Sequence, residues 1–217
     1  SFLVHRVERF RGWAPDRRAA SIAADSLRRF GNAVLGVEGP AAAIAVWRLS
    51  VDRALAIGDT AAAAAALGNI GEGFLRLDEP DSAEAHLRRA RSLARGSGDL
   101  RVEGNAAGAL ATASLDRGEL TEARQGFETA LALRRRIGDG RGAAADLNQL
   151  GLLARELGDH AAARRQLEAA LELSRRGGWT DAAATNLTNL AGLAAVEGEF
   201  ARASSLYGEA LGTWRDL

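Results

Sequence analysis

The residues that most often carry chemistry are scarce in this chain. Its three histidines, His5, His86 and His160, are isolated, and it contains no cysteine, which excludes disulfides, thiolate metal sites and cysteine nucleophiles. The stretch GDGRG at 138–142 superficially resembles a phosphate-binding loop, but no Gly-Lys-Ser/Thr motif follows it and no strand is expected before it. We interpret it as a joint between helices. The sequence therefore predicts no enzyme activity, no cofactor and no bound metal ion.

The segment 147–176 indicates which elements the chain is built from. In its first half, Leu147, Leu150 and Ala154 are spaced three and four residues apart, so they fall on one face of a helix. Its second half, after Gly158, repeats this spacing and predicts a second amphipathic helix. Two short helices with one apolar face each can bury those faces only against each other and against neighbouring pairs.

The same pair of helices recurs along the chain with a fixed 40-residue period. One position of the first helix is always small and always follows an apolar residue. Glycine inside a helix costs about 1 kcal/mol relative to alanine, so we expect close packing of two helices to compensate where the small residue is glycine. The residues in this register are Gly31, Gly71, Ala111, Gly151 and Ala191.

The expected helix ends follow the same register. Pro40 and Pro80 are one period apart and suit the first position of a helix, where a missing N–H costs nothing. Asp99 and Asp139 each follow a glycine, and we expect them to accept hydrogen bonds from the first N–H groups of the next helix.

This arrangement resembles the tetratricopeptide repeat family, whose hairpins carry a large residue and then Leu-Gly in the first helix, and Ala, an aromatic residue and Ala in the second. The resemblance covers residues 22–217 and departs in two respects. The 40-residue period is longer than the family's usual period of about 34 residues, and the proline that ends the second helix is replaced by Leu55, Arg95, Arg135 and Arg175. With these departures the chain is similar to the arrays of bacterial signal-transduction NTPases and maltose-regulator-like transcription regulators. The matching residues are Leu27, Leu67, Leu147 and Leu187 in the first helices, then Trp47, Leu87, Phe127, Leu167 and Tyr207 as the large residue and Ser50, Ala90, Ala130, Ala170 and Ala210 as the later small residue in the second helices.

The resemblance implies an all-α fold, a right-handed superhelical α-solenoid of about five helical hairpins plus an N-terminal helix. We expect residues 1–15 to form a capping helix or the remnant of a preceding unit, and residues 16–217 to form the array. Five units of one period each fill nearly all of the 217 residues, which leaves no room for a second globular domain. The expected units are about 16–57, 58–97, 98–137, 138–177 and 178–217.

The composition argues against several kinds of partner. With 28 Lys+Arg against 28 Asp+Glu, no net charge attracts the chain to nucleic acid or to an anionic membrane. No apolar run approaches the roughly 20 residues needed to span a bilayer, and no signal peptide opens the sequence, so we expect a cytoplasmic protein. Every basic residue is arginine, and with abundant alanine and glycine this bias is typical of a GC-rich bacterial coding sequence.

The resemblance also implies that the first helix of each hairpin lines a concave groove. Asparagine suits such a groove because its amide both donates and accepts, so it can pair with the backbone of an extended peptide. Any one polar residue could equally face water without a ligand. Asn69, Gln149 and Asn189 nevertheless share one register, directly before a core Ile or Leu, whereas the third unit has Ala109 there. The candidate groove residues are Arg28, Asn32, Asn69, Glu72, Arg76, Asn105, Thr112, Asn148, Gln149, Arg155, Thr185 and Asn189.

Two functional hypotheses follow. The first is a non-catalytic protein-interaction or effector-sensing array, a fragment of a larger bacterial regulator, which binds a peptide segment or a small ligand in its groove. The second is a structural scaffold or oligomerisation module without a groove ligand. In the last expected helix, Leu211 and Trp214 lie on an apolar side that no later repeat covers, so this helix is a candidate for self-association, or else it adjoins a further helix of a longer protein.

Overall fold

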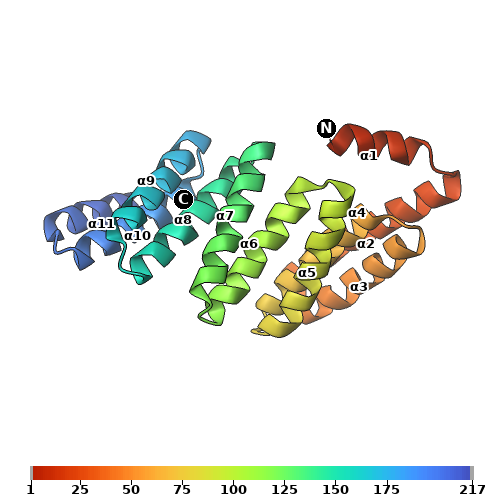
Figure 1. Ribbon diagram of the computed structural model, residues 1–217, viewed down its shortest axis with the longest axis horizontal. Helices are drawn as coiled ribbons and strands as arrows, with labels where there is room; N and C mark the ends of the chain where they lie inside the picture. The colour runs from red at the N-terminus through yellow and green to blue at the C-terminus, as the bar shows by residue number, and fades with distance from the viewer. Residues whose placement is uncertain (1, 216–217) are drawn as a thin grey trace. The chain divides into compact units, whose positions relative to one another are not determined.

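Every regular element in the described part of the chain, residues 2–215, is an α-helix of the computed structural model. The expected ends of the first and last segments, Ser1 and Leu217, lie outside these residues. The prediction of an all-α chain is confirmed. In chain order the helices are α1 (Phe2–Arg11), α2 (Pro15–Val37), α3 (Pro40–Ala56), α4 (Thr60–Leu75), α5 (Pro80–Ser97), α6 (Leu100–Asp116), α7 (Leu120–Ile137), α8 (Gly140–Glu156), α9 (His160–Gly177), α10 (Thr180–Val196) and α11 (Phe200–Arg215) (Figure 1).

The chain divides into two compact units, Ser1–Ala123 and Arg124–Leu217, and the boundary falls inside α7. In the first unit, each helix from α2 to α5 packs against the next one along the chain, and in the second unit the same holds for each helix from α8 to α10. We call α2, α4, α6, α8 and α10 the first helices of their hairpins, and the helices that follow them the second helices. Within the described residues no helix packs extensively against α1.

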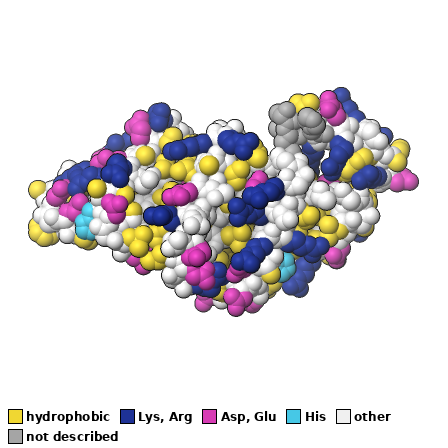
Figure 2. Space-filling model, viewed as in Figure 1, with side chains coloured by type: hydrophobic (Ala, Val, Ile, Leu, Met, Phe, Trp, Pro, Cys, Tyr) yellow, Lys and Arg dark blue, Asp and Glu magenta, His cyan; other side chains and the backbone are white. Residues whose placement is uncertain are grey.

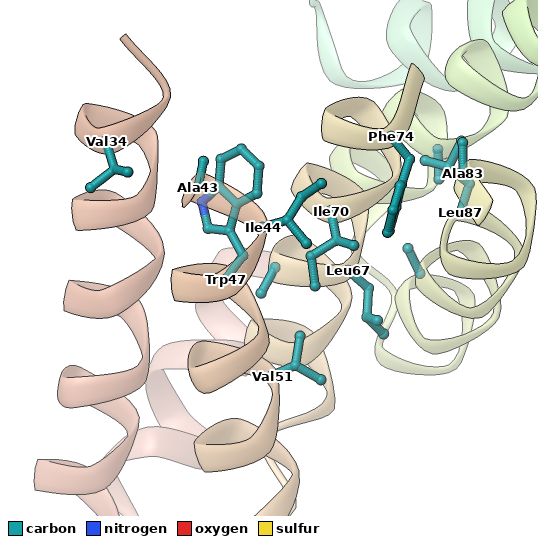
Figure 3. Close-up of a cluster of buried hydrophobic side chains, with 13 residues drawn as sticks. Val34, Ala43, Ile44, Trp47, Val51, Leu67, Ile70, Phe74, Ala83 and Leu87 are labelled. Atoms are coloured by element: carbon teal, nitrogen blue, oxygen red, sulfur yellow. The ribbon is translucent and has the colours of Figure 1, made fainter. Parts of the chain in front are cut away.

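Apolar side chains between successive helices form the core of the first unit. Trp47 of α3, Ile70 of α4 and Leu87 of α5 belong to one buried cluster, and none of them is more than 2% exposed (Figure 3). Fully burying an aliphatic or aromatic side chain contributes about 1.5–3 kcal/mol relative to leaving it in water. Because this cluster spans successive hairpins, each hairpin depends on its neighbour for stability.

Leucines dominate the core of the second unit. Leu167 and Leu171 of α9 join Leu187, Leu190 and Leu193 of α10 in one buried cluster. These residues recur at intervals of three and four along each helix, so the periodicity in the sequence correctly indicated which face of each helix is buried.

The three glycines of the 40-residue register, Gly31, Gly71 and Gly151, lie where the helices of one hairpin touch. A Cβ atom at Gly71 would lie 2.4 Å from Cγ of Leu87, and one at Gly151 would lie 2.7 Å from Cγ of Leu167. Both distances are far below van der Waals contact, so only a residue without a side chain fits. The expectation that these glycines permit close packing is confirmed.

The joints between hairpins have the expected caps. Asp99 accepts a hydrogen bond from the backbone N–H of Val102 at 3.1 Å, and Asp139 accepts one from the N–H of Gly142 at 2.9 Å. The residue before Asp139, Gly138, has a φ of +73°, a left-handed conformation that favours glycine. The stretch 138–142 is therefore a joint between α7 and α8, as predicted.

Candidate binding surface on the first helices

In the first unit, two of the candidate asparagines are bonded to each other. Asn69 of α4 donates its side-chain amide to Oδ1 of Asn32 in α2 at 2.8 Å. The same oxygen accepts the indole N–H of Trp47 at 3.1 Å, so both lone pairs of this carbonyl are used. The amide group of Asn32 and the carbonyl oxygen of Asn69 take no part in this bond and lie on side chains that water reaches. The pair thus joins neighbouring first helices and still offers a donor and an acceptor.

Arg28 is committed to a neighbour in its own helix. Its Nη2 and Nε atoms lie 2.7 Å and 3.1 Å from Oδ1 of Asp25, one turn earlier in α2. Partial burial would raise the pKa of Asp25, but the hydrogen bonds and positive charges of Arg28 and Arg29 outweigh it and hold that pKa below its usual value. The carboxylate is therefore ionised at neutral pH, and Arg28 reaches a ligand only in competition with it.

Four of the candidate residues surround one small hollow between α2, α4 and α6. Its volume is about 40 Å³, room for a few water molecules at most. The hollow can accept a single protruding group, such as a carbonyl oxygen, but not a whole side chain of a ligand. Arg28, Asn69, Glu72 and Asn105 line it, together with Ala65, Gly68, Arg101 and Val102.

The second unit holds a second pair of bonded asparagines. Asn189 of α10 donates its amide to Oδ1 of Asn148 in α8 at 2.7 Å, and both side chains are half-buried. Asn189 occupies the same register as Asn69, three repeats later. In both units the residue directly before the core Ile or Leu therefore links its helix to the preceding first helix. The acceptors differ by one helical turn, since Asn148 is in register with Arg28 rather than with Asn32.

The remaining candidates are not gathered at these pairs. The hydroxyl groups of Thr112 and Thr185 donate to carbonyl oxygens in their own helices, at 3.2 Å and 3.0 Å. Arg76 is an exposed residue at the C-terminal end of α4 and does not line the hollow. Gln149 is half-buried beside Asn148, and the guanidinium of Arg155 lies near Gly192 of α10.

Sequence reasoning missed three residues of this surface. Trp47 and Asp25 fix Asn32 and Arg28 from within the protein, and the spacing of residues in the sequence gave no sign of these bonds. Arg101 lines the hollow. It lies one helical turn before the candidate Asn105, so extending the search by a turn would have found it.

His86 and His160, the two histidines whose side chains the structure describes, lie in different hairpins. His86 packs against Phe74 with ring centroids 5.2 Å apart, and its Nδ1 bonds to the carbonyl oxygen of Ser82 at 2.7 Å. His160 is half-buried at the start of α9, and the side chain of His5 lies outside the described part of the structure. Within residues 2–215 no three His, Asp or Glu side chains converge as a metal site would require, and every helix there is too short or too polar to cross a membrane.

Comparison with known families agrees with this geometry. The family model described as tetratricopeptide repeat matches residues 103–176, which run from α6 to α9. The stretch from α6 to α9 therefore matches the tetratricopeptide repeat family. The other hairpins carry small and large residues at the equivalent positions of the same 40-residue interval. No curated protein matches the sequence.

Solved structures share the fold of this chain at low sequence identity. BtubC (BKLC) from P. vanneervenii has a TM-score of 0.73 at 15% identity, over 94% of this chain and 92% of its own. A Signal Transduction ATPase with Numerous Domains from Pyrococcus horikoshii, which has a tetratricopeptide repeat sensor, has a TM-score of 0.78 at 14% identity, over 88% of this chain and 29% of its own. A Rap protein in complex with Competence and Sporulation Factor has a TM-score of 0.74 at 16% identity, over 88% of this chain and 54% of its own. These likenesses establish the α-solenoid fold that the sequence predicted.

Proposed function

We propose that this chain is a non-catalytic interaction domain that binds an extended peptide segment, or a small effector, on the surface of its first helices. The observation that carries the proposal is the two pairs of linked asparagines, Asn69 with Asn32 and Asn189 with Asn148. Each pair is held in place by the protein and keeps amide groups free for the N–H and C=O groups of a peptide backbone. A surface of this kind recognises backbone more than side chains.

The proposal extends to the parent protein. Two of the similar structures are a signal-transduction ATPase with a tetratricopeptide repeat sensor and a Rap protein with a bound factor. By analogy we place this chain in a cytoplasmic bacterial signalling or transcription regulator, as the domain that senses the partner. The analogy rests on fold.

A binding selection tests the surface directly. Peptides are selected from a phage-displayed random library on the purified chain, and the affinity of one selected peptide is then measured by calorimetry. Replacing both partners in Asn148→Ala/Asn189→Ala leaves neither amide unsatisfied and is expected to weaken binding about tenfold, the equivalent of roughly 1.4 kcal/mol. The control Arg136→Ala/Arg165→Ala changes two exposed residues of second helices and should leave the affinity unchanged. Equal affinity for both variants would refute the assignment of these asparagines.

A scaffold that assembles through α11 is the second candidate. Tyr207 is 46% exposed, although Trp47, Leu87, Phe127 and Leu167 in the same register are 2% exposed or less. Phe200, Leu211 and Trp214 on the same helix are 73%, 51% and 47% exposed. Apolar side chains that are buried in one hairpin and exposed in the next suit contact with another helix.

Light scattering distinguishes the two candidates. If α11 mediates self-association, the molar mass in solution rises with protein concentration, and Trp214→Asp restores the monomer. A chain that stays monomeric at high concentration would exclude the scaffold and leave the binding surface as the function.

A further inference from the structure

One hollow lies between the two N-terminal helices, α1 and α2. Its volume is about 620 Å³, within the roughly 300–1,000 Å³ typical of small-molecule sites. It exists because α1 does not pack closely on α2, whereas α4 packs on α3 and α6 packs on α5 at the equivalent steps of the repeat. The apolar side chains in its lining are Val7, Phe10, Trp13 and Ile22.

The lining carries an excess of positive charge. Five arginines line the hollow against two acids, Asp25 and Asp59. Asp25 is paired with Arg28 and Arg29. Asp59 accepts the hydroxyl of Ser21 at 2.7 Å and caps α4. Both carboxylates are therefore already bonded within the protein. Four of the five arginines have no ion-pair partner within residues 2–215, namely Arg6, Arg9, Arg11 and Arg18. Figure 2 shows dark-blue side chains in the region of α1 and α2.

The aromatic wall is fixed by its neighbours. Trp13 lies between α1 and α2, and the guanidinium groups of Arg17 and Arg9 lie 4.1 Å and 5.6 Å from its ring centroid. The ring centroid of Phe10 in α1 lies 5.8 Å away. A cation over an indole face is attracted by the ring quadrupole. Trp13 therefore presents a pre-positioned apolar surface to the hollow.

A hollow in the second unit has no such charge excess. The second one has a volume of about 350 Å³ and is lined by Arg135 and Arg176 together with Asp139 and Glu172. Its charges balance, and Arg176 is paired with Glu172 at 3.2 Å. Of these two hollows, only the one at α1 combines unpaired arginines with aromatic side chains.

We propose that the hollow between α1 and α2 binds a small organic anion with an aromatic or aliphatic body. Its carboxylate, sulfonate or phosphate group pairs with Arg6 and Arg18, and its apolar body lies against Phe10, Trp13 and Ile22. Guanidinium groups form paired hydrogen bonds with such oxyanions, and the apolar wall contributes the burial of the body. The proposal does not depend on peptide binding by the first helices.

Fluorescence of 8-anilinonaphthalene-1-sulfonate, an aromatic sulfonate that brightens in apolar sites, tests the proposal on the whole chain. We expect saturable binding that naphthalene-1-sulfonate displaces, and roughly tenfold or greater loss of affinity in Arg6→Gln/Arg18→Gln. The matched control is Arg136→Gln/Arg165→Gln, which removes two exposed arginines without ion-pair partners among the described residues and should bind like the unaltered chain. Circular dichroism of both variants serves as the check that they keep their helices.

Energy transfer from tryptophan locates the dye. The chain has four tryptophans, and Trp13→Phe should remove most of the transfer to the bound dye, whereas Trp214→Phe should not. The proposal is overturned by any of three results: equal affinity in the Arg6/Arg18 and control variants, loss of transfer in Trp214→Phe rather than Trp13→Phe, or equal binding of the uncharged N-phenyl-1-naphthylamine. If an oligoglutamate peptide displaced the dye and naphthalene-1-sulfonate did not, the proposal would also be overturned, and the ligand would be an acidic peptide instead.

Discussion

The side-chain amide of Asn189 donates to Oδ1 of Asn148 at 2.7 Å and so joins two first helices that are one repeat apart. The equivalent amide three repeats earlier, that of Asn69, makes the same kind of bond to Asn32. A position that sequence reasoning assigned to a ligand is therefore also a link between repeats. Stability and binding at these residues can be separated by measurement.

Removal of the donor in Asn189→Ala should lower the free energy of unfolding by about 0.5–1.5 kcal/mol, because the half-buried oxygen of Asn148 loses its partner. In a double-mutant cycle with Asn148→Ala, we expect a coupling energy of about 0.5–1 kcal/mol, measured by urea denaturation. Thr185→Ala serves as the control, since this exposed hydroxyl bonds only within its own helix, and it should change stability by less than about 0.5 kcal/mol. Strict additivity in the cycle would mean that the bond does not form in solution.

Two glycine-to-alanine changes should have opposite signs. At Gly151 the new Cβ would lie 2.7 Å from Cγ of Leu167 and 3.2 Å from the carbonyl oxygen of Ala163, so we expect destabilisation by about 1–3 kcal/mol. At Gly208 of α11 it would meet nothing within 4 Å, so the gain in helix propensity should stabilise by about 0.5–1 kcal/mol. Thermal or urea melts of both variants decide the matter, and the close-packing argument is wrong if the two melt alike.

Asp146 should make stability depend on pH. The residue is only 2% exposed, and its Oδ1 accepts a hydrogen bond from Arg134 at 2.7 Å. Its Oδ2 has no hydrogen-bond partner among residues 2–215. Burial raises the pKa of Asp146 to about 7, against the opposing effect of the Arg134 charge. Because this pKa is above the value of about 3.9 in the unfolded chain, the folded state binds the extra proton, and stability is expected to fall as pH rises from about 4 to about 7.

The variant Asp146→Asn removes that titration while keeping the shape of the side chain. From about pH 5 to about pH 8, the unfolding free energy of the original chain should therefore fall by a few kcal/mol relative to that of the variant. A difference that is constant over this range would show that the carboxylate titrates at its ordinary pKa. Urea denaturation at the two pH values provides the measurement.

The ion pair between Glu84 and Arg117 recurs two repeats later with its charges exchanged, as Arg164 with Glu197. In the first unit, Arg117 lies 3.0 Å from Glu84 and 2.8 Å from Glu119. In the second unit, two repeats later, Arg164 pairs with Glu197 and lies 3.0 Å from Glu199.

Each single reversal, Arg164→Glu or Glu197→Arg, should cost about 0.5–1 kcal/mol by placing like charges together. The double reversal recreates the acid–arginine–acid order of the first unit and should recover most of this loss. Urea melts at low and high salt provide the measurement, because screening should shrink the single-variant effects. If the double variant is the least stable of the three, the two registers are not equivalent.

Much of the fold could be predicted from the sequence because helical hairpins are specified locally. The three- and four-residue spacing of Leu147, Leu150 and Ala154 defines one face of α8, and Asp139 marks its start through a hydrogen bond to a residue three positions away. The 40-residue recurrence then predicted the glycines at the contact between helices. These features depend on neighbours within one repeat, which the sequence displays directly.

Only the tertiary structure decided which atoms meet across repeats. Asn189 bonds to Asn148, whereas the equivalent Asn69 bonds to Asn32, one helical turn further along the acceptor helix. A shared register therefore does not determine which nearby side chain on the neighbouring first helix accepts the hydrogen bond. The commitment of Arg28 to Asp25, the burial of Asp146, and the arginine-lined hollow beside α1 likewise arise from how closely helices approach. Periodicity assigns a residue to a face, but distance and desolvation, which depend on all the packed neighbours together, determine what that residue does there.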